Sequence, residues 1–140
     1  TLHDPCNVVR LMGVKRTQRE ILHHICRQFR EMNPHGAENY CCGGGSGFAI
    51  MNRNNIEAWR NNISGRRKMQ QICQAFGDCL GPETQKYICA PCSNCKGQIR
   101  EMLEHSHLLE KNSLQYGGIV ELIVNAMVDV NPGFIKWEEE

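Results

Sequence analysis

Residues 40–48 read Tyr40-Cys41-Cys42-Gly43-Gly44-Gly45-Ser46-Gly47-Phe48, and the rest of the chain is best interpreted around them. Two adjacent cysteines cannot both turn into a core, because consecutive side chains diverge in helices and strands alike. Both sulfurs can face one point if the backbone curls around it, and the glycines that follow permit such a path. A group held by two thiolates is most naturally iron or zinc. Phosphate is the alternative, but neither standard phosphate-binding spacing is present.

Composition and charge narrow the class of protein. The 140 residues suffice for one domain with its own core, which we take as residues 1–140. With 16 basic and 15 acidic residues the chain is nearly neutral, so nothing indicates a nucleic acid or an anionic membrane surface as partner. No apolar run is long enough to span a membrane, and the polar first ten residues are not a signal peptide. The abrupt start leads us to expect a piece of a larger protein.

Nine cysteines are the unusual feature of the composition. Secreted domains held together by disulfides usually have an even number of cysteines and are smaller than this chain. The odd count, the adjacent pair and the lack of a signal peptide favour a reducing compartment, the cytoplasm, and metal-bound thiolates. Some of the nine should be only small buried hydrophobic residues. We assign Cys26 and Cys73, which fall on apolar helical stripes, and Cys89, inside a strand, to the core.

Hydrophobic periodicity predicts alternating strands and helices. The expected strands are 1–3, 29–32 and 86–90, and the expected helices are 16–30 (ending earlier if 29–32 is a strand), 53–76 with a break near Ser64-Gly65, a helix beginning at Ser93 or Asn94, and about 117–128. The basic run Arg66-Arg67-Lys68 is expected to be a solvated face. This order predicts an α/β fold, a small parallel sheet flanked by helices.

Three cysteine-bearing loops follow the three expected strands. In a parallel sheet all strand C-termini lie on one edge, and ligands bind outside that edge. Thiolates can therefore converge although 34 residues separate Cys6 from Cys41 and 49 separate Cys42 from Cys92. A structural zinc site closes at four ligands, whereas thiolate-rich sites also select iron–sulfur clusters. The candidate ligands, of which zinc would need four, are Cys6, Cys41, Cys42, Cys92 and Cys95.

Two further residues are weaker candidates for ligands. His3 lies inside a strand, where a histidine is more often packed or hydrogen-bonded. Cys79 lies in a loop 36 residues beyond Cys42, but its partner position is Pro82, which cannot bind a metal. The run Cys89-x-x-Cys92-x-x-Cys95 looks like a ferredoxin motif, but that motif needs a further cysteine at position 99, which is Ile99.

The cysteine motifs resemble those of the cysteine-rich CCG domain of the heterodisulfide reductase family. That family has one cysteine, then Cys-Cys-Gly, then C-x-x-C, and the flanks His3-Asp4-Pro5-Cys6 and Ala90-Pro91-Cys92-Ser93-Asn94-Cys95-Lys96 are similar too. The resemblance covers about residues 1–105, and it is greatest to the DsrK-type catalytic subunit of the membrane complex associated with dissimilatory sulfite reduction. The second spacer is longer than usual, which we attribute to an insertion around 64–84, and Cys79 stands where a shorter spacer would end.

The resemblance implies an oxidoreductase with a non-cubane 4Fe-4S cluster. The five candidate cysteines would bind it, Cys41, Cys42, Cys92 and Cys95 would act in catalysis through it, and Gly43, Gly44 and Gly45 would line it. Such a cluster reduces or forms a disulfide or trisulfide in one-electron steps. The alternative is a zinc-binding structural module without redox activity, and an isolated domain need not be active or hold a metal.

The resemblance also implies partners in dissimilatory sulfur metabolism. They are ferredoxin-type clusters elsewhere in the parent chain and a haem-bearing membrane subunit, at the cytoplasmic face of a membrane complex. A small protein thiol carrier, DsrC-like by resemblance, is the expected substrate. Its cysteine would enter a pocket rimmed by Asn7-Val8, Ser46-Gly47-Phe48 and Ser93-Asn94, with Arg66-Arg67-Lys68 as a docking surface.

Overall fold

A two-stranded parallel sheet stands at the centre of the computed structural model, which describes residues 1–51 and 53–127. Strand β1 (Lys86–Cys89) pairs with β2 (Leu114–Gly117), with Cys89 opposite Gly117. Leu2 adds a parallel bridge to Cys89 on the other edge of β1, where the backbone N–H of His3 donates to the carbonyl of Cys89 at 2.8 Å. The expected small parallel sheet within an α/β fold is confirmed.

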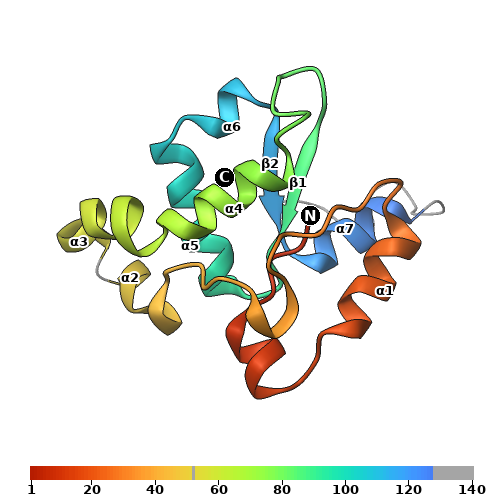
Figure 1. Ribbon diagram of the computed structural model, residues 1–140, viewed down its shortest axis with the longest axis horizontal. Coiled ribbons are helices and arrows are strands. Elements are labelled where there is room, and N and C mark those ends of the chain that lie inside the picture. The colour runs from red at the N-terminus through yellow and green to blue at the C-terminus, as the bar shows by residue number, and fades with distance from the viewer. Residues whose placement is uncertain (52, 128–140) are drawn as a thin grey trace, which may run out of the picture.

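Side chains of β1 alternate between the two faces of the sheet, as strand geometry requires. Ile88 and Ala90 enter a buried cluster whose other members include Ile72 and Ile99, whereas Cys89 packs with Leu2 and Leu22 on the opposite face. Figure 1 shows the consequence, with α4 and α5 on one side of the strands and α1 and α7 on the other. The bounds of these helices are Arg16–Ile25 (α1), Arg66–Ala75 (α4), Ser93–His105 (α5) and Ile119–Ala126 (α7).

The remaining helices are short. They are π-turns at Asn7–Leu11 and Arg60–Ser64, 3-10 turns at Gly36–Glu38 and Gly45–Gly47, and α2 (Phe48–Met51), α3 (Arg53–Trp59) and α6 (Leu108–Lys111). Helices α2 and α3 lie at the end of the molecule away from α1 and α7 (Figure 1). None of the helices in the described part of the chain combines the length and the hydropathy that a membrane crossing requires.

The strand predicted at 29–32 is wrong, and the helix predicted over 16–30 is shorter than that range. The first helix ends at Ile25, and residues 26–35, all of them described, form neither helix nor strand. The segment passes from one face of the sheet to the other. Phe29 packs on one face with the cluster of Leu2, and Met32 is buried on the other face with the cluster of Ile88. The apolar residues that suggested a strand are therefore those that bury this connecting segment against the two core clusters.

Other boundaries follow the prediction more closely. The helical region from residue 53 breaks where expected, because the π-turn ends at Ser64 and α4 begins at Arg66. The last helix begins at Ile119 instead of 117, since Gly117 still pairs with Cys89 in the sheet, and its expected end at 128 lies outside the described residues. Strand β2 was not predicted, because its four residues include the polar Gln115 and end in a glycine, and so lack the apolar run that marks β1.

Candidate metal centre

All five candidate ligands line one cavity of about 70 Å³. Cys6 follows the bridge segment, and Cys92 and Cys95 follow β1, so these three lie at the carboxyl edge of the sheet as expected. Cys41 and Cys42 reach the same cavity without a strand before them. The cavity is lined by Cys6, Asn7, Cys41, Cys42, Gly44, Gly45, Ser46, Cys92, Asn94 and Cys95.

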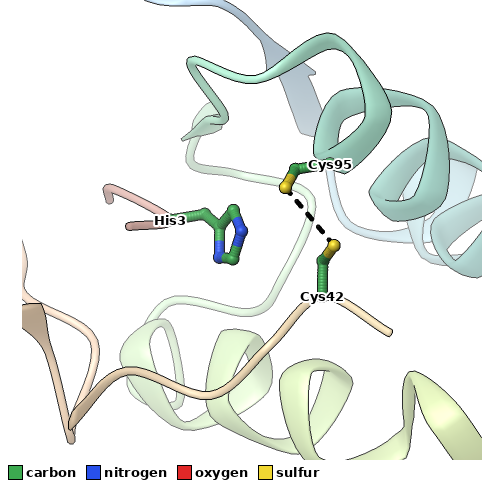
Figure 2. Close-up of side chains that lie close together, drawn as sticks. All are labelled: His3, Cys42 and Cys95. Carbon is green, nitrogen blue, oxygen red and sulfur yellow. Dashed lines mark hydrogen bonds between the residues drawn. The ribbon is translucent and has the colours of Figure 1, made fainter. Parts of the chain in front are cut away.

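Exposure of the five thiols is graded across the cavity. Cys42 and Cys95 are buried, each 4% exposed, and their Sγ atoms lie 3.3 Å apart (Figure 2). Cys92 is half-buried, with its sulfur 3.9 Å from the Nδ2 of Asn7, and Cys6 and Cys41 are exposed. All nine cysteines lie in the described part of the chain and are free thiols. The cavity therefore has an inner end with buried sulfurs and a mouth with exposed sulfurs.

The glycine loop aims backbone amides at the cysteine pair. The N–H of Gly43 donates to the sulfur of Cys41 at 3.3 Å, and the N–H of Gly44 donates to the sulfur of Cys42 at 3.4 Å. Amide donors of this kind favour the thiolate form of a cysteine. Cys95 lies in the first turn of α5, where the helix dipole also favours negative charge. Three of the five sulfurs thus face groups that stabilise thiolates.

The conformation of Gly43 is fixed by its contact with Ser64, the last residue of the π-turn that precedes α4. Its φ is +88°, and a Cβ atom at this position would lie 2.6 Å from both the carbonyl carbon and the carbonyl oxygen of Ser64. The hydroxyl of Ser64 donates to the carbonyl of Gly43 at 3.1 Å. Only glycine fits this contact, which holds the loop around the cavity.

The Cys41 and Cys42 thiols are protonated near pH 7 when no metal is bound. The contact with Cys42 and burial raise the pKa of Cys41 well above its ordinary value. The hydrogen bond with Cys41 acts to lower the pKa of Cys42, but the contact with Cys95 and burial outweigh it and raise this pKa to about 12. Crowded, protonated thiols release their protons when a metal binds. The donor set therefore fits a thiophilic metal or cluster.

Lys68 corrects the expectation that residues 66–68 form a solvated face. Arg66 and Arg67 are exposed, but Lys68 is 0% exposed because it shares the inner side of α4 with Gln71 and Ile72, at i+3 and i+4. Burial lowers the pKa of Lys68 to about 8, against the opposing effect of Cys42 and the other thiols. A cation thus lies behind the cysteine pair, and the helical spacing to Ile72 was the signal that sequence reasoning missed.

The ammonium of Lys68 begins a buried hydrogen-bonded chain. It donates to Oδ1 of Asn39 at 2.7 Å, to Oε1 of Gln71, and to the sulfur of Met32 at 3.6 Å. The Nδ2 of Asn39 lies 3.2 Å from the carbonyl of Asp4 and 3.5 Å from Nδ1 of His3. This chain ties α4 to the segment that carries Cys6, across the back of the cavity.

His3 lies deeper in the site than its weak standing as a ligand candidate suggested. It is 1% exposed, and a ring nitrogen lies within 4.8 Å of the sulfurs of Cys42 and Cys95. Figure 2 shows the ring turned toward these two side chains. Burial and the charge of Lys68 lower the pKa of His3 to about 3, so the ring is neutral near pH 7.

The structure separates Cys79 from the candidate centre. Cys79 lines a different cavity of about 160 Å³, together with Cys26 and Cys89. Cys89 is 1% exposed and Cys26 packs against the Leu2 cluster, in keeping with their assignment to the core, while Cys73 is half-buried on α4. Burial raises the pKa of Cys89 to about 12, as for an ordinary buried thiol. Of the two alternatives for the third loop, only Cys92 reaches the cavity of Cys41 and Cys42.

Comparison with known proteins gives a family and two curated relatives. The family model described as "Cysteine-rich domain" (CCG) matches residues 1–100. The "Hdr-like menaquinol oxidoreductase iron-sulfur subunit 2" of Archaeoglobus fulgidus is 28% identical over 130 residues, which are 91% of this chain and 21% of the relative. The "Hdr-like menaquinol oxidoreductase iron-sulfur subunit" of Archaeoglobus profundus is 25% identical over the same length, with the same coverage. The chain spans about a fifth of the length of these relatives. No solved structure matches it.

Proposed function

Because the chain belongs to the family of CCG cysteine-rich domains, we propose that it is the cluster-binding domain of a heterodisulfide-reductase-like oxidoreductase. The observation that carries the proposal is the convergence of five cysteines, from three loops, on one cavity. The relatives are named as iron–sulfur subunits, which supports an iron–sulfur group over other thiophilic metals. Their greater length is in keeping with this chain being one domain of a larger iron–sulfur protein.

The finer proposal is a non-cubane 4Fe-4S cluster on Cys6, Cys41, Cys42, Cys92 and Cys95. Five sulfurs around one cavity exceed the four that a structural zinc closes on, and Gly44 and Gly45 leave their part of its wall without side chains. A bound cluster would supply one-electron transfer. The five thiolates of this chain would hold it, with Cys42 and Cys95 buried at the inner end of the cavity and Cys6 and Cys41 at the mouth.

We extend the proposal to the substrate, a disulfide or trisulfide of a small DsrC-like protein thiol carrier, as for the DsrK type. Reducing a disulfide to two thiols takes two electrons and two protons. The electrons would pass to or from other iron–sulfur regions of the parent chain and a haem-bearing membrane subunit, at the cytoplasmic face of a membrane complex. The side chains of Asn7, Ser46 and Asn94 at the cavity are uncharged, so a small anionic thiol finds no counter-charge among them.

A basic groove beside Cys41 supports a protein as the carrier. This groove, of about 320 Å³, is lined by Arg10, Tyr40, Cys41, Arg66 and Arg67 among others. The guanidinium of Arg67 lies 5.8 Å from the ring centroid of Tyr40. Lys68 is buried and takes no part, so of the three residues expected from the sequence only Arg66 and Arg67 belong to this docking surface.

Binding of the carrier is tested by amide shifts in the labelled chain. We expect a cysteine-bearing carrier tail to shift the amides of Asn7, Ser46 and Asn94 and to bind more weakly to Arg67→Glu. Arg27→Glu reverses the charge of another exposed arginine, just after α1, and serves as the control that should bind normally. Shifts confined to surfaces away from the cavity, or equal weakening by both variants, would refute the carrier proposal.

One observation favours a second function, a zinc-binding module without redox activity. The sulfurs of Cys42 and Cys95 and a ring nitrogen of His3 all lie within 4.8 Å of one another, a spacing that a single ion can bridge. Zinc is redox-silent, so this function would be structural.

Ligand assignment is tested with matched cysteine variants after anaerobic iron–sulfur reconstitution. Cys92→Ser should lose the visible absorption and most of the iron, because it removes a cavity sulfur. Cys79→Ser, which changes a thiol of the other cavity, should keep both. The reverse result, with iron kept in Cys92→Ser and lost in Cys79→Ser, would overturn the choice of the third loop.

A further inference from the structure

His3 carries a buried polar atom that nothing in the described part of the chain satisfies. Its Nε2 has no hydrogen-bond partner, although the side chain is 1% exposed. A buried polar group left unpaired is energetically unfavourable, so folded proteins retain few of them without a reason. The ring faces Cys42 and Cys95 (Figure 2), so the unpaired atom adjoins the candidate metal centre.

The neighbours of His3 decide which ring nitrogen carries the proton. Lys68 is a donor only, so the atom of Asn39 that faces it at 2.7 Å must be the acceptor Oδ1. The other amide atom, Nδ2, then donates to the carbonyl of Asp4 at 3.2 Å and faces Nδ1 of His3 at 3.5 Å. A proton on Nδ1 would set two donors against each other. The neutral ring therefore carries its proton on Nε2.

We propose that the Nε2–H of His3 donates a hydrogen bond to a sulfur atom at the metal centre, with its tautomer set by Lys68 through Asn39. The proposal rests on the cluster-binding function proposed above. A protonated Nε2 has no free lone pair, so His3 is a positioning residue and not a metal ligand. Hydrogen bonds to the sulfurs draw charge from a cluster and make it easier to reduce.

The tautomer is tested without any metal, by the nitrogen chemical shifts of the His3 ring in the labelled, metal-free chain. We expect a pyrrole-type, protonated Nε2 and a pyridine-type Nδ1. The opposite tautomer would overturn the proposal whatever the iron content of the protein. This measurement needs no variant, so it stands even if substitutions of the buried His3 fail to fold.

The hydrogen bond to sulfur is tested in the reconstituted protein by potentiometric titration followed by electron paramagnetic resonance. His3→Leu removes the donor and should shift the midpoint potential to more negative values while leaving the iron content unchanged. His3→Gln places an amide N–H near the same position and should restore the potential. An unchanged potential in His3→Leu would overturn the donor role, and a loss of iron that His3→Gln fails to rescue would make His3 a ligand instead.

Failure of the proposed function is distinguishable from failure of this inference. If the wild-type chain takes up no cluster, the proposed function fails and the bond to cluster sulfur fails with it. The ring tautomer of the metal-free chain separates the two cases. A protonated Nε2 supports the tautomer inferred from the contacts of Asn39, whereas a protonated Nδ1 contradicts it.

Discussion

Asp4 ties the segment that carries Cys6 to the rest of the fold. Its side chain is 0% exposed and accepts hydrogen bonds from Arg19 at 2.9 and 2.7 Å and from the backbone N–H of Gly36 at 2.6 Å. Arg19 also binds Glu31, so one guanidinium connects three stretches of chain. Burial acts to raise the pKa of Asp4, but the hydrogen bonds from Arg19 and Gly36 outweigh it and hold this pKa below its ordinary value.

We predict that Asp4→Asn lowers the free energy of unfolding by about 3 kcal/mol, because it leaves part of a buried charge network unpaired. Urea denaturation of the metal-free chain measures the loss. Glu20→Gln is the matched control, since it removes an exposed ion pair with Arg16 and should cost no more than about 0.5 kcal/mol. Equal effects of the two variants would contradict the role given to Asp4.

The ion pair between Asp4 and Arg19 also predicts how the free energy of unfolding depends on pH. Since the pKa of Asp4 is lowered on folding, its contribution is fully present above the ordinary carboxyl value, about 4, and is lost as the pH falls from there through the lower folded-state value. The difference in unfolding free energy between the wild type and Asp4→Asn should therefore shrink below about pH 4. A difference that stays constant down to pH 3 would contradict this account.

At the scale of elements, the glycine loop depends on a contact with Ser64, at the end of the π-turn that precedes α4. Gly43→Ala should cost more than about 2 kcal/mol and abolish iron uptake, because the new Cβ meets the backbone of Ser64 and φ is positive. Gly13→Ala is the control, with a φ of +71° but nothing within 4 Å of the new Cβ. It should cost about 1 kcal/mol and leave iron uptake unchanged. Normal iron uptake by Gly43→Ala would show that the loop does not shape the cavity.

Local patterns predicted some elements and misjudged others for identifiable reasons. Strand β1 and the break after Ser64 were predictable, because a short apolar run and a glycine are local signals. The strand expected at 29–32 was not found, because burial of Phe29 and Met32 on opposite faces reflects tertiary packing. Lys68 was expected at the surface because three consecutive basic residues indicate a solvated face. Its helical spacing to the buried Ile72, which places it on the inner side of α4, was not taken into account.

At the scale of the whole molecule, topology decides which cysteines share a cavity. Cys79 precedes β1 and Cys92 follows it, so the length of the strand, about 3.3 Å per residue, separates the two loops. Spacing along the chain left this choice open, since Cys79 stands where a shorter spacer would end. Convergence of the other loops was predictable from the parallel sheet, but the Cys41–Cys42 loop arrives by the buried contacts of Asn39 rather than from a strand.

The nature of the bound group is the central claim, and metal and sulfide analysis of the wild-type chain tests it most directly. The chain should be produced and reconstituted without oxygen, offered both iron with sulfide and zinc, and analysed for all three beside its visible absorption. We predict a coloured protein with about four iron and four sulfide ions per chain. A colourless protein that holds one zinc ion and no sulfide, even after reconstitution, would contradict the account and leave the structural zinc module in its place.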